Sequence, residues 1–161
     1  MVGSPNDLPK LRAATAVLEE LEVPYEVVVA SAHRTPEKAA TYAARAAEKG
    51  LEVIIAGAGL AAHLPGVVAA HTHLPVIGVP LSGGSLGGLD ALLSVVQMPS
   101  GVPVATVGID AFKNAALLAA SILALKDREL AERLKDYRQR TVADLEAEAE
   151  RRIGELWGAG S

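Results

Sequence analysis

The segment from Ser31 to Pro36 (SAHRTP) carries side chains that could bind an anion and move a proton. An arginine such as Arg34 binds phosphate oxygens through paired hydrogen bonds, and the hydroxyl of Ser31 can add another. Histidine has the unperturbed side-chain pKa nearest neutrality, so His33 is a candidate proton donor or acceptor beside the anion. The simpler interpretation is a surface loop in which Thr35 caps the next helix.

A second candidate lies near the start of the printed chain, in the segment GSPND at residues 3–7. Gly3 permits a tight turn, while Ser4 and Asn6 offer hydrogen-bonding groups. The helix expected to follow supplies free N–H donors and the positive end of its dipole, a combination that can hold a phosphate. An ordinary capped helix start is the simpler interpretation of this segment alone.

Small residues follow a predicted strand in the segment AGAGLAAHLPG at residues 56–66, where the backbone could approach a ligand closely. The spacing differs from the GxGxxG loop of dinucleotide-binding proteins, and no acidic residue lies at the end of the next strand, so we exclude NAD. A pocket lined by Gly and Ala with one histidine could hold a small neutral molecule near a proton donor. Taken by itself, His63 is interpreted as a core histidine with satisfied hydrogen bonds.

Two further histidines, His71 and His73, suggest a metal site at first sight. They precede a predicted strand, at the end opposite the expected site, and no nearby Asp or Glu completes a ligand set. We therefore expect no metal there. The spacing also supports no Ser/His/Asp triad.

Apolar runs of β type alternate with helical patterns, which predicts an α/β domain of three layers with right-handed crossovers. The predicted strands are Tyr25–Ala30, Glu52–Ala56, Pro75–Val79 and Val102–Val107. The second and third are almost continuously apolar, which is typical of parallel strands covered on both faces. Ligands of open parallel sheets bind at the carboxyl ends of the strands, so we expect the candidate segments to meet there.

Helical periodicity fills the intervals between these strands. The predicted helices are one with the face Leu11, Ala14, Val17, Leu18 and Leu21 and with Pro9 in its first turn, one from Pro36 to Gly50 with the face Ala39, Ala43, Ala46 and Ala47, and three more over Ala61–Ala70, Leu86–Gln97 and Asn114–Leu125. Residues 126–157 predict a further, long amphipathic helix. Its apolar face must lie either on its own core or on another subunit, and the sequence leaves both open.

Composition limits the classes of protein to consider. The chain has 161 residues, which favours a single domain over residues 1–161, with an α/β core at 1–125 and the helix at 126–157. Half of the residues are hydrophobic, which excludes intrinsic disorder, and the net charge of −4 argues against a nucleic-acid partner. There is no cysteine, no apolar run long enough to cross a membrane and no pattern of a signal peptide, so we expect a cytoplasmic protein.

Taken in order, the segments GSPNDLP, SAHRTP, AGAGLAAHLPG, GLDALLSVVQMPSGVPVATV and KNAALLAASILALKD resemble the PurE family, the 5-(carboxyamino)imidazole ribonucleotide mutases of purine biosynthesis. The resemblance runs from about Gly3 to Asp127. It implies a flavodoxin-like fold, a homo-octamer with active sites at subunit contacts, a small ribonucleotide as substrate, and neither a cofactor nor a metal.

The resemblance also implies a role for each candidate residue. His33 matches the histidine that donates and later removes a proton, and His63 matches a second histidine of the pocket. Positions that match the ribonucleotide-binding residues of the family are Ser4, Asn6, Asp7, Ser31 and Arg34, while Gly59, Leu60, Ala61 and Ala62 would line the carboxylate and CO2 site.

Three positions depart from the family pattern. Only Met1-Val2 stands where an apolar first strand is usual, so either the start of the chain was placed late or the first strand is missing or truncated. Asn6 replaces the usual Ser and can still bind phosphate. Leu60 replaces a typical Gly, which costs energy if the backbone there needs a positive φ.

Two alternatives to the mutase stay open at this point. One is a carboxylase of the same family that adds free CO2 to aminoimidazole ribonucleotide. The SAHRTP and AAHLPG segments favour the mutase, because the carboxylase branch usually has Lys after the first His and lacks the second. The other is a non-catalytic protein that binds a ribonucleotide, against which the titratable His33 argues.

Overall fold

A parallel β-sheet forms the centre of the computed structural model, which describes residues 1–158. The strands β1 (Ile54–Gly59), β2 (Val76–Leu81) and β3 (Ala105–Thr106) are adjacent in that order. Register is set by pairs such as Ile54 with Val76 in β1 and β2 and Ile77 with Ala105 in β2 and β3. Parallel strands joined by helical crossovers confirm the predicted α/β architecture.

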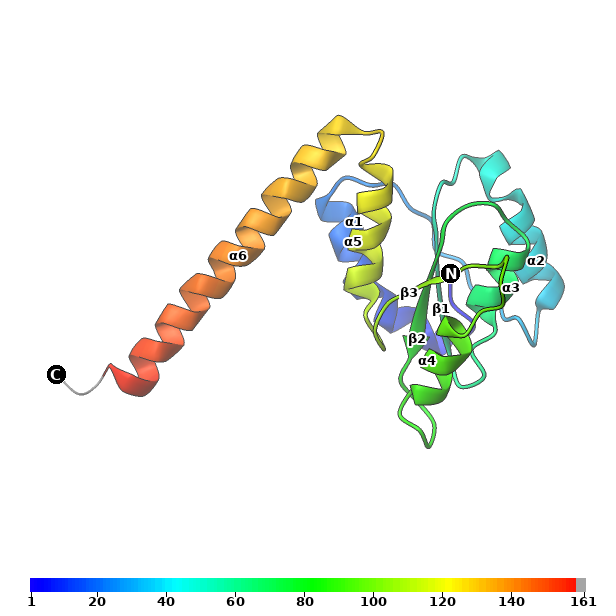
Figure 1. Ribbon diagram of the computed structural model, residues 1–161, viewed down its shortest axis with the longest axis horizontal. Helices are drawn as coiled ribbons and strands as arrows, with labels where there is room; N and C mark the ends of the chain where they lie inside the picture. Colours follow the sequence, from blue (N-terminus) through cyan, green and yellow to red (C-terminus); the bar gives the residue numbers. More distant parts are fainter. Residues whose placement is uncertain (159–161) are drawn as a thin grey trace.

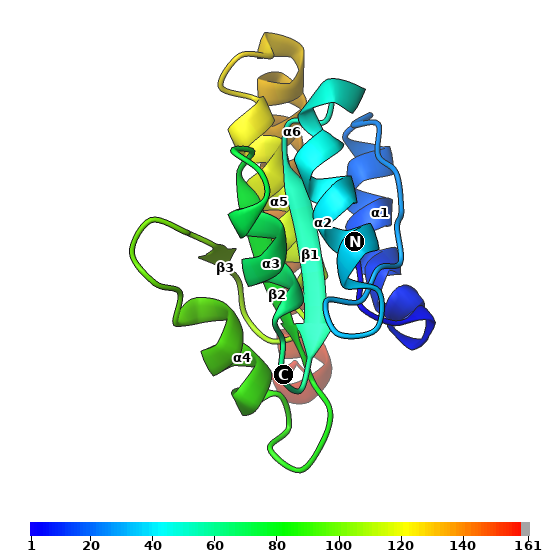
Figure 2. The same ribbon diagram turned by 90° about the vertical axis from the view of Figure 1, so that its right-hand side faces the viewer.

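Helices cover both faces of this sheet (Figure 1). The helical elements are the 3-10 helix η1 (Pro5–Leu11), α1 (Arg12–Glu20), α2 (Pro36–Arg45), the 3-10 turn η2 (Ala47–Lys49), α3 (Leu64–Ala70), α4 (Leu89–Val96), α5 (Phe112–Leu123) and α6 (Arg128–Trp157). One buried cluster joins α1, α5 and the start of α6 to β2 through residues such as Ile77. The other joins α2, α3 and α4 to β1 through residues such as Ile54. Figure 2 shows the second set of helices from the front.

The strands are apolar because both of their faces are buried. All six residues of β2 are buried. Gly57 and Gly78 let helical side chains come close, since a Cβ at Gly57 would lie 2.5 Å from Phe112 and one at Gly78 would lie 2.4 Å from Val95. Gly in these strands is therefore required by close packing rather than by backbone conformation.

The prediction of a strand at Tyr25–Ala30 is wrong. Only Val29 is paired there, in an isolated parallel bridge to Val2, and Val2 forms a second bridge to Gly57. Met1 and Val2 thus lie between residues 28–30 and β1, where a first strand of the sheet would lie. Among residues 1–158, no strand lies beside residues 24–27, so these residues form no ladder of backbone hydrogen bonds.

Other element boundaries also differ from those predicted. Strand Val102–Val107 shrinks to two paired residues, Ala105 and Thr106. Helix Leu86–Gln97 begins at Leu89, because Gly87 and Gly88 adopt positive φ values of 60° and 98°. The helix predicted over Ala61–Ala70 begins at Leu64, since the chain turns at Leu60 first.

Smaller corrections concern the first two helices and the fifth. Pro9 lies inside the 3-10 helix η1 rather than in the first turn of an α-helix. Ala47 is exposed in η2, whereas Ala39, Ala43 and Ala46 are buried as predicted. Gly50 ends this region at a φ of 83°, as predicted. The helix predicted at Asn114–Leu125 starts and ends two residues earlier, at Phe112–Leu123.

The long C-terminal helix α6 starts on its own domain and then leaves it (Figure 1). Asp127 caps it by accepting a hydrogen bond from the backbone N–H of Leu130 at 3.0 Å. Its first turns bury Leu130, Leu134 and Tyr137. Farther along, Leu145 and Leu156 are 69% and 70% exposed. Within residues 1–158 no helix is both long and apolar enough to span a membrane.

Candidate active site

His33 and His63 meet at the carboxyl end of the sheet. His33 follows the segment that runs beside Val2, and His63 follows β1 just before α3. His33 Nε2 lies 2.5 Å from His63 Nδ1, and the rings are nearly perpendicular at 81°. At this distance one nitrogen donates and the other accepts, so the pair holds one proton between these two atoms. Both side chains are exposed, which makes the interpretation of His63 as a core histidine wrong.

The two predicted anion-binding segments lie side by side. Arg34 Nη2 donates to the backbone oxygen of Gly3 at 3.0 Å, which ties the SAHRTP loop to the GSPND loop. Ser4 is the N-cap of η1, and its Oγ accepts from the backbone N–H of Asn6 at 3.3 Å. The loop therefore begins a helical turn next to a guanidinium, and the N–H groups of Asn6 and Asp7 are bonded to Ser4.

Ser31 is held by hydrogen bonds within its own loop. Its Oγ accepts from the backbone N–H of Arg34 at 3.2 Å. Its backbone N–H donates to Thr35 Oγ1 at 2.8 Å. Thr35 is the N-cap residue of α2, yet its side chain makes no capping bond because it is engaged with Ser31. The loop is thus built around Ser31 and Arg34 rather than around a helix cap.

Asp7 belongs to the GSPND loop, and the pKa of its carboxyl is shifted. Partial burial raises the pKa of Asp7, against the opposing effects of Lys10, the Ser4 backbone and Arg34. A carboxyl at this position can accept hydrogen bonds from neutral donors.

The small-residue segment at residues 59–62 forms the end of β1 and the turn before His63. Gly59 is half-buried, Ala62 is 1% exposed, and Leu60 and Ala61 are exposed. Leu60 adopts a φ of 55°, so the position does use the left-handed conformation that favours Gly. A Cβ on Gly84 would lie 2.6 Å from Leu60 Cδ2, which places Leu60 directly against the loop that follows β2.

Sequence reasoning missed an ion-pair network at the same edge of the sheet. Lys10 Nζ lies 2.6 Å from Asp110 Oδ1 and 3.0 Å from Ser82 Oγ. Although burial, the largest single effect, raises the pKa of Asp110, the hydrogen bonds from Lys10 and Ser82 together lower it. Ser82 and Asp110 follow β2 and β3, so the rule about strand ends could have found them. The network fixes the loop that touches Leu60.

The remaining histidines lie away from this cluster. His71 Nδ1 lies 2.8 Å from the backbone oxygen of Val67, at the end of α3, and His73 is exposed before β2. No three His, Asp or Glu side chains of residues 1–158 are grouped so that they could share a metal ion.

Comparison with known proteins identifies the family. The model of a family described as AIR carboxylase matches residues 1–144. The chain belongs to the AIR carboxylase family. The match spans the sheet, both histidines, both anion-binding segments and the start of α6.

Relatives within this family share most of the chain. An N5-carboxyaminoimidazole ribonucleotide mutase of Pyrococcus abyssi is 62% identical over 86% of this chain and 80% of its own length. The N5-carboxyaminoimidazole ribonucleotide mutase of Thermotoga maritima is 54% identical over 94% of this chain and 88% of its own length. A phosphoribosylaminoimidazole carboxylase of Schizosaccharomyces pombe is 60% identical over 77% of this chain but only 22% of its own.

A solved structure supports the same fold. Treponema denticola PurE superposes with a TM-score of 0.81 at 28% identity, covering 97% of this chain and 95% of that one. Together with the parallel sheet and its helical layers, this match confirms the flavodoxin-like α/β fold that the sequence predicts.

Proposed function

We propose that this member of the AIR carboxylase family converts 5-(carboxyamino)imidazole ribonucleotide into 4-carboxy-5-aminoimidazole ribonucleotide. The observation that carries the proposal is the His33–His63 contact of 2.5 Å beside the joined anion-binding loops. The names of relatives that are 54–62% identical support the same reaction.

The proposed binding mode uses the loops as they lie. The phosphate binds to Arg34 and Ser31, with the side chains of Ser4 and Asn6 as further donors. Asp7 accepts hydrogen bonds from the ribose. The aminoimidazole then reaches His33 and His63, and Gly59, Leu60, Ala61 and Ala62 enclose the carboxylate.

The chemistry then needs one proton and a closed pocket. The bond between the exocyclic nitrogen and its carboxylate breaks, the electron pair stays on nitrogen, and His33 protonates that nitrogen. The CO2 remains in the pocket, ring carbon C4 attacks it, and His33 takes back the C4 proton. Each proton is returned, so the step is an isomerisation. Trapped CO2 has a high effective concentration, so the proposed route requires neither a metal nor a cofactor.

His63 assists this cycle through the proton that it shares with His33. When His33 Nε2 gives its proton to the substrate, His63 Nδ1 remains 2.5 Å away and orients the His33 ring to take back the C4 proton. We therefore assign both histidines to proton transfer, with His33 as the acid and base and His63 as its partner.

The assembly is part of the proposal. The exposed leucines of α6 require a surface to cover them, and a homo-oligomer, an octamer by resemblance to the family, supplies one. The partner of the enzyme is a small ribonucleotide, and we expect it to bind neither a nucleic acid nor a membrane. We place the enzyme in the cytoplasm.

A carboxylase that uses free CO2 is the second candidate, and the fungal carboxylase at 60% identity favours it. Offering carboxyaminoimidazole ribonucleotide to one sample, and aminoimidazole ribonucleotide with bicarbonate to another, separates the two. We expect fast turnover of the first substrate only. Efficient use of the second would assign the carboxylase, and binding without turnover of either would leave only a ribonucleotide-binding protein.

A further inference from the structure

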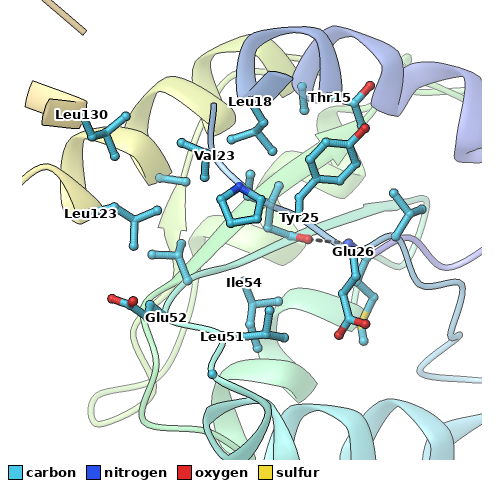
Figure 3. A pocket seen from close by; sticks show the side chains of 18 of the residues that line it. Thr15, Leu18, Val23, Tyr25, Glu26, Leu51, Glu52, Ile54, Leu123 and Leu130 are labelled. Carbon is cyan, nitrogen blue, oxygen red and sulfur yellow. Dashed lines mark hydrogen bonds between the residues drawn. The ribbon is translucent and has the colours of Figure 1, made fainter. Parts of the chain in front are cut away.

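A cavity of about 780 Å³ lies apart from the residues assigned to the reaction, and none of them lines it. Figure 3 shows apolar side chains such as Leu18, Leu51 and Ile54 around this cavity. Charged side chains at its rim pair with one another, as Lys49 does with Glu26 at 3.3 Å. The polar cluster that bears on the site lies instead at the carboxyl edge of the sheet.

Lys10 lies where three segments meet at this edge. Its ammonium nitrogen Nζ donates to Asp110 Oδ1 at 2.6 Å, to Ser82 Oγ at 3.0 Å and to the backbone oxygen of Ser82 at 3.1 Å. An ammonium has three donor hydrogens, so these three acceptors use all of them. Lys10 belongs to η1, Ser82 follows β2 and Asp110 follows β3. One side chain thus ties η1 to the loops after two strands.

The carboxylate of Asp110 is fixed in place to receive this cation. Its Oδ1 also accepts from the backbone N–H of Ser82 at 3.0 Å, and its Oδ2 accepts from the Ser82 hydroxyl. Its backbone has a φ of 56°, in the left-handed region that Asp and Asn adopt more readily than other residues with a Cβ. Both carboxylate oxygens are therefore held by Ser82 independently of Lys10.

Asp7 lies on η1 three residues before Lys10. In a 3-10 helix, side chains three residues apart lie one above the other, so Asp7 and Lys10 are on the same side of η1. Burial is the largest effect on the Asp7 carboxyl and raises its pKa. Three charged groups act on it as well: Lys10 and Arg34 lower the pKa, and Asp110 raises it.

The contacts of Lys10 indicate how it would affect a bound ribonucleotide. Because its three hydrogens are already used, Lys10 acts through Asp7 rather than by touching the ligand. Without this cation, Asp7 would face the fixed carboxylate of Asp110, and a like charge disfavours the ionised form. An ionised carboxylate is the stronger acceptor for a hydroxyl, since charge-assisted hydrogen bonds are roughly twice as strong as neutral ones.

We propose that Lys10 is a positioning residue of the ribose site: anchored on Ser82 and Asp110, its ammonium keeps Asp7 in the ionised form that accepts hydrogen bonds from sugar hydroxyls. The inference rests on the proposed function, because that function assigns Asp7 to the ribose. Asp110 has two effects here, since it anchors Lys10 and at the same time opposes the charge of Asp7.

The test measures the pKa of Asp7 in the ligand-free protein, from the carboxyl ¹³C shifts of aspartate-labelled chains, with Asp7→Asn to identify the signal. Lys10→Met removes the cation from a side chain of similar length, so the pKa of Asp7 should rise. Asp110→Asn keeps an oxygen that accepts from Lys10 and Ser82, and Asn tolerates the same φ. Only the negative charge is lost, so the pKa of Asp7 should fall.

Two further variants serve as controls. Lys10→Arg keeps the charge and should leave the pKa of Asp7 close to that of the unchanged chain. Lys135→Met removes the same charge from α6, where Lys135 pairs with Glu132 at 3.4 Å, and should have no effect on Asp7. The side chains of Lys10 and Asp110 are 32% and 36% exposed, so their replacement leaves the buried core intact.

Opposite shifts separate an electrostatic role from a merely structural one. Lys10→Met and Asp110→Asn break the same ion pair, so a structural role predicts that both shift the pKa of Asp7 in the same direction. Shifts in the same direction, or no rise in Lys10→Met, would overturn the proposal.

A second measurement connects Asp7 to the ribose. The affinity for aminoimidazole ribonucleotide is measured by calorimetric titration over a range of pH. As Asp7 takes up a proton the affinity should fall, and this fall should begin at a higher pH in Lys10→Met and at a lower pH in Asp110→Asn. Inorganic phosphate, which has no sugar hydroxyls, should bind with the same pH dependence in all variants.

The two measurements fail in different ways. Opposite shifts of the Asp7 pKa without a matching displacement of ribonucleotide affinity would overturn the ribose part of the proposal. Absence of any ribonucleotide binding would contradict the proposed function itself. The titration of Asp7 uses neither ligand nor turnover, so it decides the effect of Lys10 in either case.

Discussion

The side chains that we assign to the proposed reaction are exposed, and they make short contacts with one another or with neighbouring backbone. His33 and His63 share a hydrogen bond, and Arg34 reaches across to the backbone of Gly3. An exposed side chain contributes little to stability, so its replacement reports on function rather than on folding.

Replacing His33 with Asn tests the proton-transfer role. Asn fills a similar space and can hydrogen-bond, but it cannot exchange a proton near neutral pH. We expect turnover of carboxyaminoimidazole ribonucleotide to fall by roughly 10²- to 10⁴-fold, with ribonucleotide binding retained. His71→Asn, in a histidine exposed at the other end of the sheet, should leave turnover unchanged. Full activity of His33→Asn would refute the assignment.

Replacing Arg34 with Ala tests the phosphate site. Loss of a charge-assisted contact should weaken ribonucleotide binding by about 1.5–3 kcal/mol, measured by calorimetric titration. Arg45→Ala removes an equally mobile cation from the end of α2, where Arg45 pairs with Glu48 at 3.5 Å, and serves as the control. An unchanged dissociation constant for Arg34→Ala would contradict the proposed binding mode.

Leu60 offers a test of backbone strain. Its φ of 55° costs a residue with a Cβ about 1–2 kcal/mol, and its side chain is 56% exposed, so little burial is lost on removal. Gly loses more backbone entropy on folding than Leu does, and this cost offsets part of the relieved strain. Leu60→Gly should therefore raise the free energy of unfolding by about 0.5–1 kcal/mol. Leu60→Ala keeps the strain and should bring no gain in a denaturant titration. Equal effects of the two variants would show that side-chain size, not φ, matters.

At the scale of elements, the main peculiarity is the position of Met1 and Val2. Val2 is bridged to Val29 on one side and to Gly57 on the other. The α-amino group of Met1 therefore lies inside the molecule, where burial lowers its pKa to about 6.

This terminus predicts a pH dependence of stability. Its pKa is about 6 in the folded chain against 8.0 when exposed, so between these values the unfolded chain binds a proton that the folded chain does not. The free energy of unfolding should therefore rise by about 2 kcal/mol from pH 6 to pH 8. Acetylation of the α-amino group removes the titration, and urea unfolding at both pH values should show the rise only in the free form. The same rise in both forms would disprove the prediction.

The whole molecule combines a compact α/β body with a helix that extends beyond it (Figure 1). The first turns of α6 bury apolar side chains on α5 and α1, and the later turns expose them. The sequence left open whether this helix covers its own core or another subunit, and the structure answers in part, because the core covers only the first turns of the helix.

Replacing exposed leucines of α6 with charged residues tests the proposed assembly. Each Leu that is covered in an oligomer contributes about 1.5–3 kcal/mol, so Leu145→Glu together with Leu156→Glu should dissociate it. Analytical ultracentrifugation should show a smaller particle with unchanged helix content. Leu125→Glu, at a position that is 87% exposed before α6, is the control. An unaltered mass of the double variant would exclude this face as the interface.

Local patterns in the sequence were sufficient for much of this account. Continuous apolar runs predict β1 and β2, because strands that are buried on both faces are apolar along their whole length. Helical periodicity predicts the Ala face of α2. The candidate residues His33, Arg34 and Ser4 follow from residue chemistry and from the rule that parallel strands end at one edge. These properties depend on neighbours along the chain.

Tertiary structure decided what depends on distant neighbours. Residues 25–30 have the composition of a strand but lack the adjacent strand that would pair with them, so only Val29 is bridged. Lys10 and Asp110 are 100 residues apart, and only folding brings their charges together. The exposure of His63 and the left-handed turn at Leu60 likewise depend on how β1 ends against the loop after β2. Pairing and close contact are properties of the folded sheet, and no local pattern encodes them.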